Sequence, residues 1–349
     1  MSLNNKGFIN KIFDYSKLSE LLPLETPLSI LIDPSNICNF QCIFCPTGDK
    51  KLLKSINRPK GLMSYELFCK IIDDIQGFPQ QVGSLTLYKD GEPFVNNDLG
   101  KMIKYAKSKN VAEVLRTTTN ASLLTKAKSI EIIESGLDQI RISVEHVNNE
   151  GYKKITRTYA GYETVRKNIE FLYNEKVKRS SNLRIFVKII DINLTEEEKE
   201  KFINDFGAIS DEYNFDKYVD WANSEKDELI KDKVTETSMN GKLKINKSLK
   251  VCPDPFRLLA VNFNGTVSVC AIDWSLNANI GDVTKENLVD IWNGDKLRNI
   301  RYLNLIGDRE KIKSCENCHF VLGNNTDLDA NIDKLMKKYN FCDSSTKLC

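Results

Sequence analysis

Three cysteines that could bind metal together, Cys38, Cys42 and Cys45, lie in one short stretch of the sequence. They directly follow an apolar run, 28–32, that predicts a strand. Structural zinc sites close with four ligands, whereas a cubane iron–sulfur cluster held by three thiolates keeps one iron open for a small molecule. An open iron is a place to do chemistry. A zinc knuckle or three unrelated buried thiols are the alternatives.

The cysteine spacing is CxxxCxxC, with the aromatic Phe44 just before the last cysteine. On these residues the chain resembles the radical S-adenosylmethionine (SAM) superfamily. The resemblance implies that the three thiolates hold a 4Fe-4S cluster whose fourth iron is chelated by SAM. It also implies that a donor such as flavodoxin or ferredoxin supplies an electron, and that SAM then yields a 5′-deoxyadenosyl radical, which abstracts a hydrogen atom from the substrate. The protein would position the cofactor and keep out competing reactions.

The composition narrows the possible partners and compartment. The 349 residues are enough for two domains, and 50 Lys and Arg against 48 Asp and Glu give no reason to expect nucleic acid. No signal peptide or transmembrane stretch is visible, so we expect a cytoplasmic protein that makes no use of a membrane. Its 10 cysteines then favour metal or redox roles over disulfides. Apolar residues at helical spacing, Phe8, Ile9, Ile12 and Phe13, favour a short helix on the core over one on a membrane surface.

Short apolar runs alternate with helical patterns through the first two thirds of the chain. The expected strands are 28–32, 82–88, 111–117, 139–144, 183–189 and 218–221. A helix is expected behind the N-cap Ser64, where Phe68, Ile71, Ile72 and Ile75 recur at helical spacing, and further helices are expected at 99–108, 125–135, 162–173 and 195–206. Such alternation predicts an α/β fold with a parallel sheet. Six repeats are too few for a closed eight-fold barrel, so a partial (β/α)6 barrel fits, which is the superfamily's usual core. Ligands bind at the carboxyl ends of such strands, where the cysteine loop lies.

We expect five segments along the chain: an N-terminal extension at 1–27, the barrel at 28–222, a charged linker at 223–250, a small cysteine-rich domain at 251–322 and a tail at 323–349. The extension is short for a leader-peptide recognition domain. In the cysteine-rich part, Asn264-Gly265 predicts a two-residue type I′ hairpin, and a helix is expected around 288–292.

Four further places resemble the superfamily's SAM contacts. Gly91-Glu92-Pro93 follows the second strand, where relatives bind the methionine ammonium; an ordinary turn is the alternative. Asn120 follows the third strand, although Ala121 replaces a glycine there and Asn also starts turns. Ser143 lies in the fourth strand, where relatives contact the methionine carboxylate or ribose. Arg157 matches an arginine near the SAM carboxylate, with a plain surface arginine as the rival.

A second cysteine set, Cys252, Cys270, Cys315 and Cys318, resembles the SPASM and twitch appendages of radical SAM enzymes. Four thiolates could saturate one auxiliary 4Fe-4S cluster, which then moves electrons rather than binding substrate. The leftover thiols, Cys69, Cys342 and Cys349, are too few for a second auxiliary cluster. A four-cysteine zinc site is a rival, and so is c-type haem attachment at 315–319, which would need export.

The resemblance predicts SAM cleavage and hydrogen-atom abstraction, but it says less about what becomes of the substrate radical. A cluster beside the substrate radical invites one-electron oxidation, and the cysteine spacings resemble the 2-deoxy-scyllo-inosamine dehydrogenase type. We therefore expect an oxidoreductase that dehydrogenates a small carbohydrate-like or cyclitol alcohol. That reaction needs a base for the hydroxyl proton, which the sequence does not identify. Peptide or protein modification is the second hypothesis, and a non-catalytic metal-binding scaffold is the third.

Overall fold

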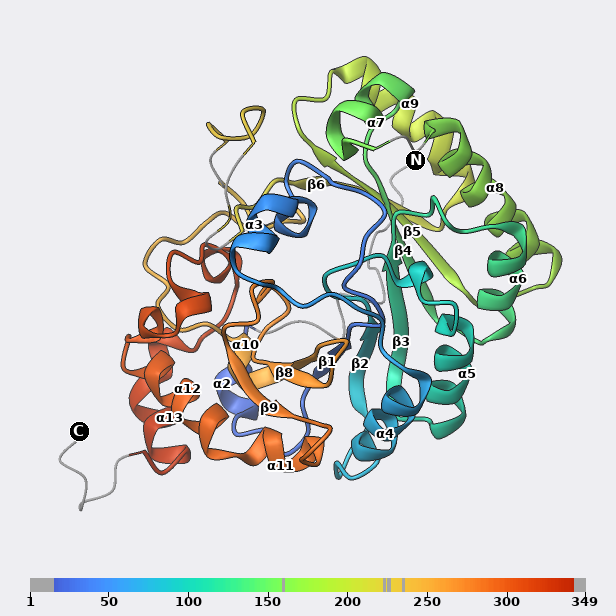
Figure 1. Ribbon diagram of the computed structural model, residues 1–349. Helices are drawn as coiled ribbons and strands as arrows, with labels where there is room; N and C mark the ends of the chain where they lie inside the picture. Colours follow the sequence, from blue (N-terminus) through green and yellow to red (C-terminus); the bar gives the residue numbers. More distant parts are fainter. Residues whose placement is uncertain (1–15, 159–160, 222–223, 225–226, 234–235, 342–349) are drawn as a thin grey trace.

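A single curved sheet organises the protein, shown in Figure 1 as a computed structural model that describes residues 16–158, 161–221, 224, 227–233 and 236–341. The sheet has 9 strands in the order β6-β5-β4-β3-β2-β1-β7-β8-β9. Strands β1 to β6 pair in parallel with their sequence neighbours. The α/β fold with a parallel partial barrel is therefore confirmed.

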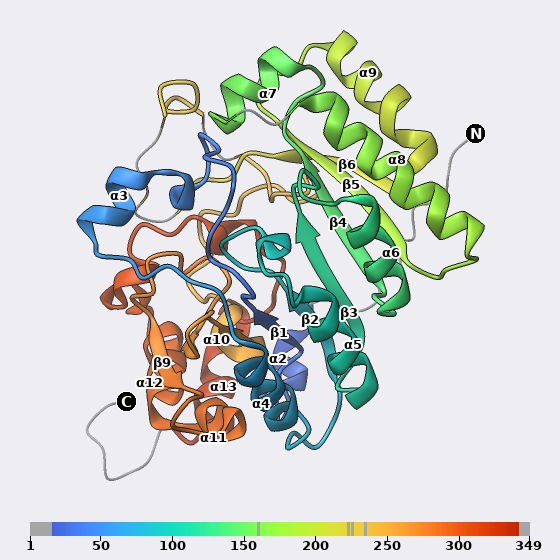
Figure 2. The ribbon, with the colours of Figure 1, turned by 45° about the vertical axis from the view of Figure 1, so that its right-hand side comes forward.

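The barrel strands are β1 Ser29–Ile32, β2 Val82–Leu87, β3 Ala112–Thr119, β4 Gln139–Val144, β5 Arg184–Asp191 and β6 Glu212–Lys217. Their crossover helices are α4 Tyr65–Ile75, α5 Leu99–Lys109, α6 Lys126–Glu134, α8 Tyr162–Lys178 and α9 Glu196–Phe206, and they lie along the outer face of the sheet (Figure 2). Ser64, Thr125 and Thr195 cap α4, α6 and α9 with side-chain oxygens that accept backbone N–H bonds. These helices confirm the five predicted ones.

The sixth strand lies earlier than predicted. The sequence pattern favoured 218–221, whereas β6 is Glu212–Lys217 and pairs with β5. Because β6 is the edge of the sheet, it is covered less completely and carries polar residues, so its apolar content is a weak signal. The more apolar 218–221 segment instead follows the strand, and Tyr218 packs with Ile43 and Ile155 beneath the cysteine loop.

The C-terminal region extends the same sheet. After α10 Asp254–Arg257, strand β7 Leu258–Val261 pairs in parallel with β1, and β8 Thr266–Ser268 and β9 Asn279–Asp282 follow antiparallel. Helices α11 Leu288–Asn293, α12 Asp295–Leu305 and α13 Ile332–Lys338 pack beside them, and α11 confirms the expected helix. One hydrophobic core runs from Ile30 to Cys318 through both parts.

The hairpin between β7 and β8 differs from the two-residue type I′ turn we predicted. Val261 pairs with Val267, and the N–H of Asn262 donates to Thr266 O at 2.8 Å. Three residues, 263–265, therefore form the loop. Gly265 has a φ of +88°, whereas Asn264 is not among the described residues with positive φ. A three-residue hairpin needs a left-handed residue only at its last position, which Gly265 supplies.

The remaining helices are short: α2 Leu18–Leu21, α3 Lys50–Ser55 and α7 Asn149–Thr156. No helix among the described residues is long and apolar enough to cross a membrane. The apolar residues Phe8, Ile9, Ile12 and Phe13, and the thiols Cys342 and Cys349, lie outside the described residues. The five segment boundaries proposed from sequence stay predictions.

Candidate active site

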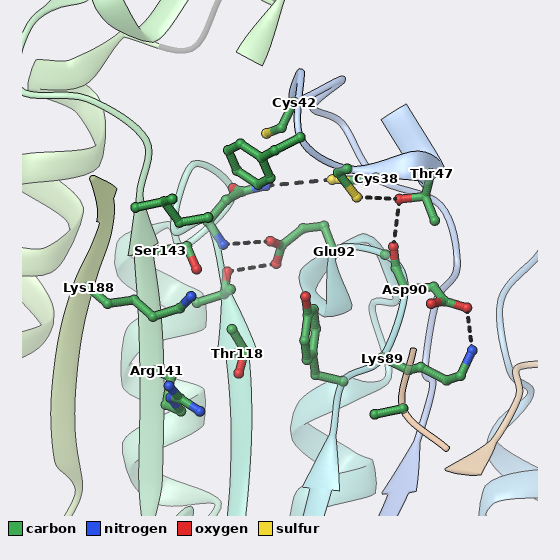
Figure 3. Close-up of a pocket in the computed structure, with 18 of the residues that line it drawn as sticks. Cys38, Cys42, Thr47, Lys89, Asp90, Glu92, Thr118, Arg141, Ser143 and Lys188 are labelled. Atoms are coloured by element: carbon green, nitrogen blue, oxygen red, sulfur yellow. Dashed lines mark hydrogen bonds and ion pairs between the residues drawn. The ribbon is translucent and has the colours of Figure 1, made fainter. Parts of the chain in front are cut away.

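A cavity of about 330 Å³ opens at the carboxyl ends of the barrel strands. Figure 3 shows part of its lining, with Cys38 and Cys42 on one side and Ser143 and Lys188 on another. Most of the predicted site residues line it together: Cys38, Cys42, Cys45, Gly91, Glu92, Asn120 and Ser143. Pro93 and Arg157 do not. The structure thus gathers residues from β2, β3, β4 and the loop after β1 around one space.

The cysteine loop is fixed by backbone bonds to its neighbours. The N–H groups of Gln41 and Ile43 donate to the carbonyls of Thr156 and Ile155, at 2.9 and 3.0 Å. Thr47 Oγ1 lies 3.0 Å from Cys45 Sγ and donates to Asp90 O at 3.0 Å. The loop is therefore anchored to the end of α7 on one side and to the turn after β2 on the other.

The three thiols suit a metal cluster by their donor chemistry. Burial raises the pKa of Cys38 to about 12 and also raises the pKa values of Cys42 and Cys45, so burial disfavours bare thiolates. Metal cations offset that cost by replacing the protons. Among the described residues no three His, Cys, Asp or Glu side chains are grouped around a single point as for one ion. In a cubane each thiolate bonds a different iron, and three sulfurs spread along one cavity wall fit that need.

Glycine is required at position 91 by a close approach of backbone. A Cβ there would lie 2.0 Å from Ser35 O and 2.7 Å from Ile37 O. The next N–H, of Glu92, donates to Ile37 O at 3.0 Å. The turn after β2 is thereby packed directly onto the start of the cysteine loop.

Glu92 is buried, and its carboxylate accepts hydrogen bonds from three neighbouring groups. Its carboxylate accepts from Thr119 Oγ1 at 2.7 Å, Asn120 N at 2.8 Å and Phe94 N at 3.1 Å. Burial raises its pKa to about 7, against the lowering by these hydrogen bonds. A buried carboxylate without a strong cationic partner is suited to an incoming ammonium group. Pro93 begins the following 3₁₀ turn and lies behind Glu92 rather than in the cavity.

Asn120 is both a turn residue and a neighbour of the cysteine loop. Its Oδ1 accepts from Ser122 N at 2.9 Å, while its Nδ2 lies 3.0 Å from Asn39 Oδ1 and 4.0 Å from Cys38 Sγ. Ser143 faces the cavity from β4, with Arg141 and Glu145 on the same face. Arg157 ends α7 with a φ of +55° and forms an ion pair with Asp227 away from the lining.

The second cysteine set also gathers around one space. Cys252, Cys270, Cys315 and Cys318 line a cavity of about 310 Å³. Burial raises the pKa of Cys315 to about 12 and lifts those of the other three thiols above their usual value. The Cys252 N–H donates to Asn304 Oδ1 at 3.2 Å. Four thiols with raised pKa values, two of them buried and two half-buried, fit a saturated cluster, because metal cations offset the cost of forming thiolates as in the first set.

Asp273 joins segments of the second cysteine set, a role that the sequence analysis did not predict. It accepts from Ser268 Oγ at 2.7 Å and Ser314 Oγ at 2.6 Å, beside Cys270 and Cys315. The N–H groups of Asn277 and Ala278 donate to it at 3.0 and 3.1 Å. A single carboxylate thus joins the segments that carry two of the thiols.

A buried ionic cluster joins the two sites. Asp90 accepts from Arg58 Nη2 at 2.5 Å and from Lys89 Nζ at 2.6 Å, and all three side chains are at most 1% exposed. Arg58 Nε also donates to Trp274 O at 2.5 Å, and Lys89 Nζ to Asp273 O at 3.0 Å. The turn after β2 is therefore tied to the segment that carries the second cysteine set.

Comparison with known proteins identifies the family. The sequence profile of the Radical SAM superfamily matches residues 32–205, and that of SPASM, an iron-sulfur cluster-binding domain, matches residues 252–319. Together the two matches span most of the chain, which belongs to the radical SAM superfamily and carries a SPASM domain. As such an enzyme it uses a 4Fe-4S cluster and SAM, with auxiliary iron–sulfur binding in the SPASM domain.

Individual relatives are more distant. A probable GTP 3′,8-cyclase of Methanococcus maripaludis is 31% identical over 134 residues, 38% of this chain and 41% of that protein. The chain thus spans about two fifths of the length of such curated relatives. BtrN in complex with AdoMet and 2-DOIA has a TM-score of 0.53 at 17% identity, over 86% of this chain and 96% of BtrN. Streptococcus suis SuiB bound to precursor peptide SuiA has a TM-score of 0.61 at 15% identity, over 84% and 72%. At these identities the structures show a shared fold.

Proposed function

We propose that this protein is an oxidoreductase that dehydrogenates a small carbohydrate-like or cyclitol alcohol, using an auxiliary 4Fe-4S cluster at Cys252, Cys270, Cys315 and Cys318. The observation that carries the proposal is the contact between the two cavities. Five residues line both of them: Leu31, Arg116, Ala271, Ile272 and Phe320. A substrate in the first cavity is therefore separated from the second cysteine set by a single layer of side chains.

Oxidation of an alcohol to a ketone removes a hydrogen atom from carbon, a proton from oxygen and one further electron. When bound, SAM and the two clusters supply hydrogen-atom abstraction at the first cavity and an electron acceptor at the second. A flavodoxin or ferredoxin would supply the electron that starts the reaction.

The chain's own residues suit a polyhydroxylated substrate between the two thiol sets. The hydroxyls of Thr86, Thr118 and Ser143 line the first cavity from β2, β3 and β4. Each hydroxyl can donate one hydrogen bond and accept two, as sugar hydroxyls can. These side chains would orient the substrate, and the walls would keep water from the reacting carbon.

The test is hydrogen transfer from candidate alcohols. Anaerobically reconstituted protein with dithionite and SAM is incubated with sugars or cyclitols deuterated at each secondary carbon. For one labelled secondary carbon, we expect deuterium to appear in 5′-deoxyadenosine and that carbon to become a ketone. A ketone without deuterium transfer, or transfer without a ketone, would contradict the proposed oxidation.

Peptide modification is the second candidate, because SuiB, which has a similar fold, is known in complex with its precursor peptide. The same assay separates the two candidates. Deuterium transfer from labelled peptides and from no sugar would replace the first proposal with the second. A non-catalytic scaffold would form no 5′-deoxyadenosine with either.

A further inference from the structure

Acidic side chains line one end of the first cavity, where Lys89, Lys188 and Lys217 also lie, and two arginines line its other end. The acidic residues Asp90, Glu92 and Glu145 line its upper end, near the cysteine loop. Arg116 and Arg141 line its deeper part, below Thr119 and Ser143 on their strands. At about 3.3 Å per residue, Arg141 lies about 6.6 Å deeper along β4 than Ser143. In Figure 3, Arg141 is correspondingly farther than Ser143 from Cys38 and Cys42.

Arg141 has no anionic partner among the described residues. Its Nε is buried and makes no hydrogen bond, and no carboxylate in the described part of the chain pairs with its guanidinium. The guanidinium lies 5.1 Å from the ring centroid of Phe186, the residue beside it on β5. A buried donor without a hydrogen-bond partner is costly, and an anion in the cavity would supply that partner.

The neighbouring cations differ in that they already have partners. Lys188, beside Ser143 on β5, forms an ion pair with Asp216 at 2.9 Å. Arg116 donates from Nε to Thr86 Oγ1 at 2.8 Å. Arg141 differs from Lys188 in that no carboxylate in the described part of the chain pairs with its guanidinium.

We propose that the substrate carries an oxyanion group, a phosphate or a carboxylate, which binds Arg141 deep in the cavity beneath the reacting alcohol. This inference rests on the proposed function, since it describes the substrate of that same site. Besides its carboxylate, SAM carries cationic ammonium and sulfonium groups, which match the acidic residues at the upper end. The substrate's oxyanion matches the basic lower end, and a guanidinium fork binds such a group through two parallel hydrogen bonds. Opposite charges would thereby fix which end of the substrate faces the cysteine loop.

The test measures binding without turnover. Holoenzyme reconstituted with iron, sulfide and SAM is titrated calorimetrically with glucose 6-phosphate, glucuronate and glucose under anaerobic conditions. We expect at least one charged sugar to bind about tenfold or more tightly than glucose, since a charge-assisted bond typically contributes that much. Tighter binding of glucose 6-phosphate assigns a phosphate, and tighter binding of glucuronate assigns a carboxylate.

Two variants locate the effect. Arg141→Gln should abolish the preference for the charged sugar, and Arg141→Lys should restore part of it. Arg184→Gln is the matched control, because Arg184 lies at the start of β5, pairs with Glu212 and does not line the cavity; it should keep the preference. Formation of 5′-deoxyadenosine without substrate should be unchanged in the control Arg184→Gln.

Four results would overturn the inference. The sugars could show no difference, including no binding by any of them, or the preference could survive in Arg141→Gln. Loss of substrate-free SAM cleavage in Arg141→Gln would instead assign the arginine to the cofactor. Because binding needs no oxidation, the oxyanion preference can hold even if no ketone forms. Oxidation of a neutral sugar alone would leave the proposed function standing and remove this inference.

Discussion

The two cysteine sets are built in opposite ways. Cys38, Cys42 and Cys45 lie on one loop, whereas the second set comes from three segments that meet only when β7, β8 and the 3₁₀ turn Lys313–Cys315 pack together. Within each set the thiols are buried or half-buried, and desolvation raises their pKa values. The positions of the first three thiols therefore depend on how one loop is anchored, and those of the second four depend on the groups that join their segments.

The largest expected effects come from removing one thiol of each set. Cys42→Ala should reduce the iron content from about eight to about four per chain, and so should Cys252→Ala, because each cluster holds four irons. Only Cys42→Ala should abolish 5′-deoxyadenosine formation with dithionite. Cys252→Ala should keep SAM cleavage and lose the oxidised product.

Iron, sulfide and zinc analyses check the first claim, and chromatography of 5′-deoxyadenosine checks the second. If Cys42→Ala still cleaved SAM, the assignment of the first cluster would be wrong. About four irons and one zinc in the wild-type protein would replace the auxiliary cluster with a zinc site.

The next effect tests the ionic cluster that joins the two sites. Asp90→Asn removes the carboxylate that pairs with both Arg58 and Lys89, and leaves the buried Asp33 as the carboxyl near these two cations. Breaking a buried ion pair in this way typically costs about 3–5 kcal/mol in the free energy of unfolding. Urea denaturation of the reconstituted protein measures the loss. Asp98→Asn is the control, since its pair with Lys101 is exposed and should contribute at most about 1 kcal/mol. Equal losses in the two variants would show that the buried cluster does not join the sites.

A smaller effect is expected at the second cysteine set alone. Asp273→Asn removes one of two acceptor oxygens from a group that receives four hydrogen bonds beside Cys270 and Cys315. We expect about 2 kcal/mol of local destabilisation and faster loss of the auxiliary irons to a chelator. The SAM-binding cluster should keep its irons. Asp282→Asn, whose carboxylate serves an exposed turn, is the control. If both clusters lost iron together, the two sites would not be separable in this way.

The contrast between thiols on one loop and thiols brought together from three segments also explains how much could be predicted from the sequence. The cysteine loop follows β1, the Gly91-Glu92 turn follows β2, and Ser143 lies near the carboxyl end of β4, so their positions at one edge of the parallel sheet follow from the pattern. Strand β6 was misplaced because a sheet edge needs little apolar surface. The hairpin was assigned to the wrong class because Asn-Gly suits both loop lengths, and the pairing of Val261 with Val267 decides between them.

Other features have no sequence signal. Asp90 and Asp273 act through partners far along the chain, Arg58 and Ser314 among them, and isolated charged residues predict no such contacts. The pairing of β7 with β1 likewise joins segments more than two hundred positions apart in sequence, and it is this pairing that places the second cavity against the first.

The smallest expected effect is a pH dependence of SAM binding in the first cavity. Burial raises the pKa of Glu92 to about 7, so the carboxyl is mostly protonated below that pH and charged above it. If Glu92 binds the methionine ammonium, SAM affinity should rise as the pH rises through 7, by up to tenfold for each unit below the pKa, because only the charged form attracts the cation. Equilibrium dialysis with labelled SAM between pH 6 and 8 measures this change. Glu92→Gln should bind SAM more weakly at pH 8 and lose the pH dependence. The Cys252→Ala variant should keep it, since the auxiliary set lies in the other cavity, and a flat wild-type profile would remove Glu92 from the cofactor site.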